Sequence, residues 1–283
     1  MDVQFHCDEQ HNFLNGASVR AFAYENYSID PHNHDFYEVN IVLAGSGIHC
    51  IEQGEFSVSA GDVFVLPPMV THAYRNTKDL TVYHILIKKD FLWSNREESH
   101  SVKGFIQLTE IEPVLRSNAS SACFLHLTAS QMMELKRELS WIDEGGKYDG
   151  FAHTMMRYHT VWKLLYWFSG LLDAQNQARE VSGKNHYQTA MLTALEYIHQ
   201  NYSDKITVDT LCNLTYMSRS SFLRHFYNVC GKSPAVYLNE YRCGRAVELL
   251  QKGEHSKTEV AHLCGFYDLS HMERMMKKFG TRD

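Results

Sequence analysis

The 283-residue sequence lacks the features of an exported or membrane-inserted protein. It opens with MDVQFHCDEQ, which has no basic start, no long apolar run and no small-residue cleavage site. Low-complexity segments are absent as well. Because 44% of the residues are hydrophobic, a chain of this length can fill the cores of two ordinary domains. We therefore expect a globular, cytoplasmic protein that does not associate with a membrane.

Closely spaced cysteines are also absent. The seven cysteines form no C-x-x-C pair and are scattered over positions 7, 50, 123, 212, 230, 243 and 264. A disulfide framework or a zinc ribbon would need tighter spacing. We expect most of them to be small buried side chains, with Cys212 and Cys264 on helix faces.

The chain has no strongly basic segment. Its formal net charge is -6, and only residues 186–283 have a small positive surplus. A phosphate-binding surface needs basic residues close together on that surface, but the net charge of the whole domain need not be positive. The charge balance is therefore weak evidence for nucleic-acid binding, which must be argued from motifs.

Two kinds of hydrophobic pattern organise the first two thirds of the chain. Residues 18–90 contain short alternating runs such as YEVNIVL, DVFVLPP and TVYHILI, broken by glycine or proline, which predict a small antiparallel barrel or sandwich. Apolar residues then recur with a 3.6-residue period, which predicts helices over 131–142 and 151–172. The second helix is rich in aromatic residues, and these either pack across the barrel or form part of a dimer interface.

The last third repeats one pattern twice, a short helix, a turn and a second helix. In the first copy Ser218 is the candidate N-cap of the second helix, and the predicted core is Leu211, Leu214, Met217, Phe222 and Phe226. In the second copy Gly265 lies in the turn, Asp268 is the candidate N-cap, and the predicted core is Val260, Leu263, Phe266, Met272 and Met276. One such pattern can arise by chance in a helical domain, but two copies are much harder to obtain that way.

A connecting helix is predicted between the two copies. Ser233 and Pro234 are its candidate cap and first residue, and Gly253 is its candidate end. Its length of roughly 28 Å, at 1.5 Å per residue, suits two helices that read successive major grooves roughly 34 Å apart.

The two second helices predict the DNA contacts. With the core residues facing inward, the outward side chains of the first are Arg219, Ser220, Ser221 and Arg224, and those of the second include Ser270, His271, Arg274 and Lys277. Arg224 is the best candidate for a bidentate contact to guanine. Arg274 has the same offset from Met272 that Arg224 has from Phe222.

These residues resemble the AraC/XylS family of transcription regulators. The matching motifs are S-x-x-x-F-x-R-x-F at 218–226, GKSPAVYLN at 231–239, R-x-x-x-A-x-x-L-L at 242–250 and EVAHLCGF at 259–266. The resemblance implies a homodimer that binds promoter DNA and RNA polymerase, more often an activator than a repressor. It also implies DNA contacts at Ser220, Ser221, Arg224, Ser270, His271 and Arg274.

The second unit departs from the family pattern in two ways. Met272 and Met276 stand where relatives usually have aromatic residues, and the sequence stops at Asp283, where relatives continue through a proline and another short helix. We therefore expect the second unit to contribute less to DNA binding than the first.

The N-terminal region contains two motifs of its own, PHNHDFYE and GDVFVLPPMVTHAYRN. The spacing H-x-H-x-x-x-E places His32 and His34 on one face of a strand, with Glu38 a few residues on, and His72 and Asn76 close the second motif. The motifs are similar to those of cupin barrels, in which three histidines and a glutamate hold a divalent metal. Met69 departs from the pattern, since glycine is usual there.

Two kinds of ligand suit this region. A divalent metal would be held by His32, His34, Glu38 and His72. The same side chains could instead bind the hydroxyl groups of a sugar, with aromatic rings for stacking at Phe36, Tyr37, Tyr74 and Tyr83. The barrel resembles the sugar-sensing halves of regulators in the AraC/XylS family, which implies a carbohydrate effector. The predicted ligand-binding residues are His32, His34, Tyr37, Glu38, His72 and Tyr74.

The sequence thus predicts an α+β protein, a cupin-like antiparallel barrel with helices followed by an all-α tandem helix-turn-helix domain. The expected order is a sensing domain at 1–128, a helical dimerisation or packing segment at 129–174, a linker at 175–187 and a DNA-binding domain at 188–283. We expect a ligand-controlled transcription regulator and no enzyme. The alternatives are a metal-sensing regulator and a metal-dependent cupin enzyme, although an enzyme would not need the second domain.

Overall fold

The computed structural model describes residues 2–13, 17–52, 54–93, 96–102, 104–118, 125–143, 150–181 and 186–280. The chain divides into two compact units, Met1–Val181 and Ser182–Asp283. Among the described residues, no helix is both long enough and apolar enough to cross a membrane. The described cysteines are free thiols, and all of them except the half-buried Cys7 are buried, as predicted; Cys123 lies outside the described residues.

The first unit is built on one curved sheet. Its strands are β1 Phe5–Cys7, β2 Val19–Tyr24, β3 Ile29–His34, β4 Tyr37–Ile51, β5 Gly54–Ser59, β6 Asp62–Leu66, β7 His72–Ile87 and β8 Leu125–His126. They pair in the order β1-β3-β7-β4-β6-β8, with β2 on β7 and β5 on β4. All pairs are antiparallel except β1 with β3.

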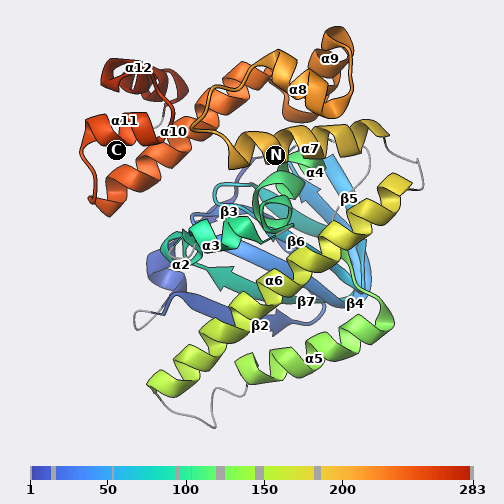
Figure 1. Ribbon diagram of the computed structural model, residues 1–283. Coiled ribbons are helices and arrows are strands. Elements are labelled where there is room, and N and C mark those ends of the chain that lie inside the picture. The colour runs from blue at the N-terminus through green and yellow to red at the C-terminus, as the bar shows by residue number, and fades with distance from the viewer. Residues whose placement is uncertain are drawn as a thin grey trace. The chain divides into compact units, whose positions relative to one another are not determined.

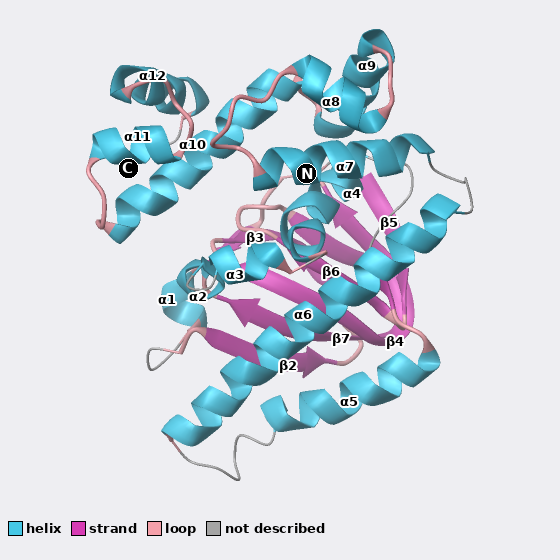
Figure 2. Ribbon diagram, viewed as in Figure 1, coloured by secondary structure: helices cyan, strands magenta, loops and turns pink. Residues whose placement is uncertain are grey.

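The long strands β4 and β7 form the centre of the sheet, which curves in the manner expected of a cupin-like barrel. Their register shifts between Val42 and Ile48, so the two halves of β4 run beside different neighbours, β6 in one half and β5 in the other. Across the interior, the hydroxyl of Tyr74 donates to Oδ1 of Asn40, at 3.2 Å. Figure 2 shows the resulting curvature of the sheet.

Helices cover the outer face of this barrel. They are α1 Glu9–Asn12, α2 Lys89–Trp93, α3 Arg96–Ser101, a π-helical turn at Gln107–Ile111, α4 Glu112–Asn118, α5 Ala129–Asp143 and α6 Phe151–Val181. Helix α6 lies across the sheet with α5 beside it (Figure 1). Side chains on the outer face of β4 and β7, such as Val39 and Ile85, pack against Leu164 and Phe168 of α6.

The aromatic residues of α6 belong to this packing. Trp162 stacks on Phe91, and the hydroxyl of Tyr158 accepts a hydrogen bond from the backbone N–H of Ser18, at 2.8 Å. Helix α6 also runs seven residues beyond the predicted start of the linker at 175. The prediction of a linker over 175–187 is therefore wrong for 175–181, which are helical, and for 186–187, which begin the next helix.

The regular elements of the second unit, over its described residues 186–280, are all helices. They are α7 His186–Gln200, α8 Val208–Thr215, α9 Arg219–Cys230, α10 Pro234–Lys252, α11 Lys257–Leu263 and α12 Leu269–Phe279. Helix α10 has the predicted bounds, because the Ser233 side chain caps its first turn and Gly253 ends it with a φ of 70°. The pairs α8–α9 and α11–α12 lie at opposite ends of α10 (Figure 1), as the tandem helix-turn-helix prediction requires.

Candidate functional site

Helix α9 presents the predicted DNA-contacting residues of the first helix-turn-helix. Ser218 caps the helix by accepting the backbone N–H of Ser221, and Phe222 and Phe226 are fully buried. With these rings turned inward, Ser220 and Arg224 are exposed and Ser221 is half-buried. Arg224 is therefore exposed to solvent on this face of α9.

Arg219 has a different environment from Arg224. Its Nη1 lies 2.5 Å from Oδ1 of Asp209 on α8, and both side chains are mostly exposed. This ion pair connects the two helices of the first unit at the start of α9. A phosphate would have to compete with Asp209 for the guanidinium of Arg219.

Helix α12 repeats the arrangement in the second helix-turn-helix. Asp268 caps it by accepting the backbone N–H of His271, at 2.7 Å, and Met272 and Met276 are buried. Ser270, Arg274 and Lys277 are exposed. His271 is half-buried, because its ring packs edge-on against the ring of Phe266, with the ring centroids 5.5 Å apart.

The prediction that Leu263 lies in the core of the second helix-turn-helix is wrong. Leu263 is 46% exposed, and the buried positions on α11 and its end are Val260, Ala261 and Cys264. The turn that follows depends on Gly265, which has a φ of 74° and approaches the backbone of Ser203 so closely that a Cβ would lie 2.4 Å from the carbonyl oxygen. Leu263 lies just before this turn, on the face of α11 turned away from the core.

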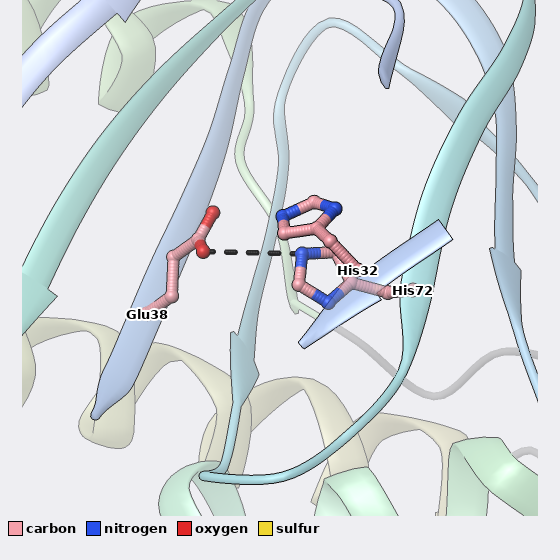
Figure 3. Close-up of side chains that lie close together, drawn as sticks. All are labelled: His32, Glu38 and His72. Atoms are coloured by element: carbon pink, nitrogen blue, oxygen red, sulfur yellow. Dashed lines mark ion pairs between the residues drawn. The ribbon is translucent and has the colours of Figure 1, made fainter. Parts of the chain in front are cut away.

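In the first unit, the predicted metal or ligand residues come together inside the barrel. His32 and His34 on β3, Glu38 on β4 and His72 on β7 are each at most 4% exposed. One ligand atom from each of His32, Glu38 and His72 lies within 4.8 Å of the others. Figure 3 shows the two imidazole rings side by side and facing the carboxylate.

The backbone fixes the protonation of the histidine rings. The Nδ1 atoms of His32, His34 and His72 lie 3.0, 2.7 and 3.1 Å from the carbonyl oxygens of residues 30, 36 and 70. A carbonyl can only accept, so each Nδ1 carries the hydrogen. In the neutral rings each Nε2 therefore presents a lone pair.

Glu38 lies among these lone pairs. Its Oε2 is 3.1 Å from Nε2 of His34 and 3.9 Å from Nε2 of His72, and its Oε1 is 2.6 Å from Nδ1 of His84. Burial raises the pKa of Glu38, but the electrostatic attraction of His84 and hydrogen bonds from Nδ1 of His84 and, when its Nε2 also carries a hydrogen, from His34 outweigh burial, so this pKa lies well below its usual value. Burial lowers the pKa of His72 to about 3. A carboxylate beside imidazole lone pairs requires a shared cation, either a second proton on a histidine or a metal ion.

Two further buried histidines inside the barrel, His49 and His84, were missed by the sequence motifs. His84 lies on β7 opposite Asn40 of β4, and His49 lies between the rings of Phe64 and Tyr74. Both lie in strand runs that bury residues on both faces, so the only signal in the sequence was a histidine within a predicted strand.

The predicted residue Tyr37 does not line the barrel interior. Its ring packs against the cluster between the sheet and the helices, as does that of Tyr83. Successive side chains on a strand point to opposite faces, so Tyr37 and Glu38 cannot both face inward. Asn76 is exposed within β7, where it has a φ of 51°, and it does not join the histidine cluster. Tyr74 does lie inside, through its hydrogen bond to Asn40.

The barrel interior is unusually rich in unpaired polar atoms. In the described part of the chain, the buried atoms without a hydrogen-bond partner include Nε2 of His72 and His84, both ring nitrogens of His49 and Nδ2 of Asn40. Buried polar groups in folded proteins are normally paired. These atoms are therefore suited to a polar ligand or an ion in the interior.

A cavity adjoins the cluster. It has a volume of about 660 Å³ and is lined by residues of β3, β4, β5 and β7, among them Asp30, Tyr74 and Arg75. It shares residues with the interior, because the carbonyl of Asp30 accepts from His32 and the hydroxyl of Tyr74 reaches Asn40. Arg75 and Glu55 form an ion pair at the cavity wall.

Both units match known families. The model of the AraC-like ligand binding domain matches residues 15–151, and a helix-turn-helix domain model matches residues 211–280. The HTH-type transcriptional activators RhaS of Salmonella arizonae and Salmonella typhimurium are each 22% identical to the chain over 247 residues, which cover 87% of this chain and 83% of theirs.

Solved structures with similarity include ToxT from Vibrio cholerae, with 11% identity and a TM-score of 0.33 over 93% of this chain and 94% of that one. Another is a transcriptional regulator with an AraC-type DNA-binding domain from Chromobacterium violaceum. It has 26% identity and a TM-score of 0.31, and the match covers 33% of this chain and 84% of that one.

Proposed function

Because the chain belongs to the AraC family of transcription regulators, with a ligand-binding domain followed by a helix-turn-helix domain, we propose that a small molecule in the first unit controls its binding to promoter DNA. The observation that carries the DNA-binding half is the pair of exposed arginines, Arg224 and Arg274, at equivalent places on two capped helices. Each guanidinium can reach O6 and N7 of a guanine.

The other proposed contacts position the protein on DNA. Ser220, Ser221 and Ser270 lie in the first turns of α9 and α12, where hydroxyl groups and helix N-termini bind phosphates. Lys277 adds a positive charge for contact with the DNA backbone. His271 and Arg219 lie at the edges of the proposed DNA-contacting surfaces of α12 and α9. Such contacts raise affinity for all sequences and make it dependent on salt.

Selection of the full-length protein on random DNA tests the DNA-reading proposal. We expect enrichment of a sequence with two conserved segments about one helical turn apart, because each recognition helix reads its own major groove. Titrations across salt concentrations then compare the selected site with scrambled DNA. Equal affinity for both at every salt concentration would refute sequence-specific binding.

For the effector we propose a carbohydrate. Sugar hydroxyl groups can donate to the Nε2 lone pairs of the barrel histidines and accept from Nδ2 of Asn40, and the ring of Tyr74 offers an apolar face. Thermal unfolding with a panel of pentoses, hexoses and deoxyhexoses tests this. A stabilising sugar whose effect is lost in His72→Ala supports the proposal, and a panel that leaves the melting temperature unchanged contradicts it.

We further propose that the protein acts as a homodimer and activates transcription with RNA polymerase. The similar RhaS proteins are named activators. Met133 and Trp141 on α5 and Phe151 at the start of α6 are large apolar side chains left exposed on the first unit, and interfaces favour such residues. Light scattering should give a dimer, and Trp141→Glu should shift it to monomer. A monomeric wild-type protein would refute this part.

A metal-sensing regulator is the second candidate. The convergence of imidazole lone pairs on the Glu38 carboxylate favours it, and the donor set of His32, His34, Glu38 and His72 fits a divalent transition metal. A bound ion would supply the positive charge that these groups share. Metal analysis of purified protein, with DNA affinity measured at several metal concentrations, tests this candidate. Turnover of a substrate would instead support the cupin-enzyme alternative.

A further inference from the structure

His84 contacts the carboxylate of Glu38 from outside both sequence motifs. Its Nδ1 lies 2.6 Å from Oε1 of Glu38, and its side chain is 2% exposed. The contact depends on strand pairing, because β4 and β7 set Asn40 opposite His84 and Glu38 opposite Leu86. The two interacting side chains therefore lie on one face of adjacent strands.

This contact determines which way the carboxylate faces. A carboxylate accepts hydrogen bonds only, so the hydrogen of His84 is on Nδ1 and is donated to Oε1. The other oxygen, Oε2, is then left toward Nε2 of His34 and of His72. Without a donor at Oε1, the terminal torsion of a glutamate is broad and would not hold this orientation.

Aromatic rings hold His84 in place. The ring of Tyr27 meets it edge-on at 4.7 Å, and that of Phe22 is stacked at 5.4 Å. A third ring, Tyr24, packs edge-on at 5.9 Å. The imidazole is therefore confined before any ligand arrives.

We propose that His84 is a positioning residue that orients Glu38 so that Oε2, together with His32, His34 and His72, binds a divalent cation. The inference rests on the metal-sensing candidate above. Residues that orient metal ligands typically change metal affinity by 10–100-fold when they are mutated.

Co²⁺ is the probe for the test, because its visible absorption reports the ligand geometry as well as occupancy. Full-length protein stripped with a chelator is titrated with Co²⁺. We expect His84→Leu to lower the affinity about 10–100-fold and to change the absorption spectrum. His84→Asn keeps a side-chain N–H near the position of Nδ1, and we expect it to bind within about threefold of wild type.

The matched control is His126→Leu. Nδ1 of His126 also contacts a carboxylate, Oδ1 of Asp62 at 2.7 Å, but this pair lies on β8 and β6 outside the cluster. We expect wild-type Co²⁺ affinity from it. Melting temperatures of the metal-free variants show whether each one is folded.

Three results would overturn the inference. His84→Leu could bind Co²⁺ as tightly as wild type, or a folded His84→Asn could bind as weakly as His84→Leu. Wild type could also bind no Co²⁺, in which case the metal-sensing candidate fails together with this inference. DNA binding measured on the same samples keeps the regulator proposal separate from both.

Discussion

At the scale of single residues, Arg224 and Arg274 occupy equivalent places but rest on different side chains. Phe222 and Phe226 lie beneath the first, and Met272 and Met276 beneath the second. Aromatic rings have few rotamers, whereas methionine is flexible and packs adaptably. We therefore expect α9 to be held more rigidly than α12.

We predict that Arg224→Ala weakens binding to the selected DNA site more than Arg274→Ala does. Loss of a bidentate guanine contact costs about 1–3 kcal/mol, and a less rigid helix loses the smaller amount. Titrations at one fixed salt concentration measure the difference, with scrambled DNA as the control. The reverse order would contradict the ranking of the two helices.

Met69 is a second informative residue, since it has a φ of 66° and a side chain that is 61% exposed. Left-handed backbone costs an ordinary residue roughly 1–2 kcal/mol. We predict that Met69→Gly stabilises the first unit by about 0.5–1 kcal/mol, after the greater chain entropy of glycine is subtracted. Urea unfolding measures this change in the free energy of unfolding.

The control for Met69 is Lys136→Gly, at an exposed lysine in the interior of helix α5. There glycine should destabilise by about 1 kcal/mol, because the backbone is helical and needs no positive φ. Destabilisation at both positions would show that no strain is relieved at 69.

At the scale of elements, α10 connects the two helix-turn-helix units and is joined to the segment after α7. Nε of Arg242 donates to the carbonyl of Tyr202 at 2.6 Å, and Nη2 donates to that of Asp204 at 2.7 Å. The side chain is 8% exposed, and burial lowers its pKa. The planar fork of the guanidinium thus serves two carbonyls at once.

We predict that Arg242→Ala destabilises the second unit by roughly 3 kcal/mol, because two carbonyls lose a charged donor. Arg242→Lys should recover only part of this, since an ammonium is a point donor without the fork. Urea unfolding followed by helical circular dichroism gives the free energies. Arg274→Ala is the control for charge removal, and an exposed site should change stability by less than about 0.5 kcal/mol.

At the scale of the whole molecule, the two units carry different kinds of buried group. The first encloses several histidines, and burial is the chief cause of the lowered pKa values of His49 and His72. The buried core of the second is mainly apolar side chains and cysteines, for example Val260, Phe266 and Cys264, and His199 is its one buried histidine among the described residues. The units should therefore respond differently to acid.

We predict that the metal-free first unit loses stability as the pH falls below about 6.5. His72 has a pKa of about 3 when folded, against 6.5 in the reference state, so protons bind the unfolded chain first. The contribution of His72 to the free energy of unfolding is complete above pH 6.5. It is lost progressively as the pH falls toward 3, at about 1.4 kcal/mol per pH unit. Urea unfolding between pH 7.5 and 5 measures the slope. His72→Gln should reduce it, and an unchanged slope would contradict the prediction.

The sequence by itself determined the local structure of the second unit and the family. Caps at Ser218, Ser233 and Asp268 and the 19-residue helix α10 are where the sequence predicted them. Capping and helical periodicity are set by residues within a few positions of one another, so no distant contact was needed. The spacing of His32, His34 and Glu38 was readable for the same reason.

Only the tertiary structure decided which distant side chains meet. The contact of His84 with Glu38, which are 46 positions apart in the sequence, depends on the register between β7 and β4. The outward direction of Tyr37 depends on the same register. Likewise Leu263 is exposed although the helical pattern placed it in the core, and α6 continues to Val181 past the polar residues that predicted a linker. Local patterns specify an element and its faces, whereas the packing of other elements against those faces determines what each face contacts.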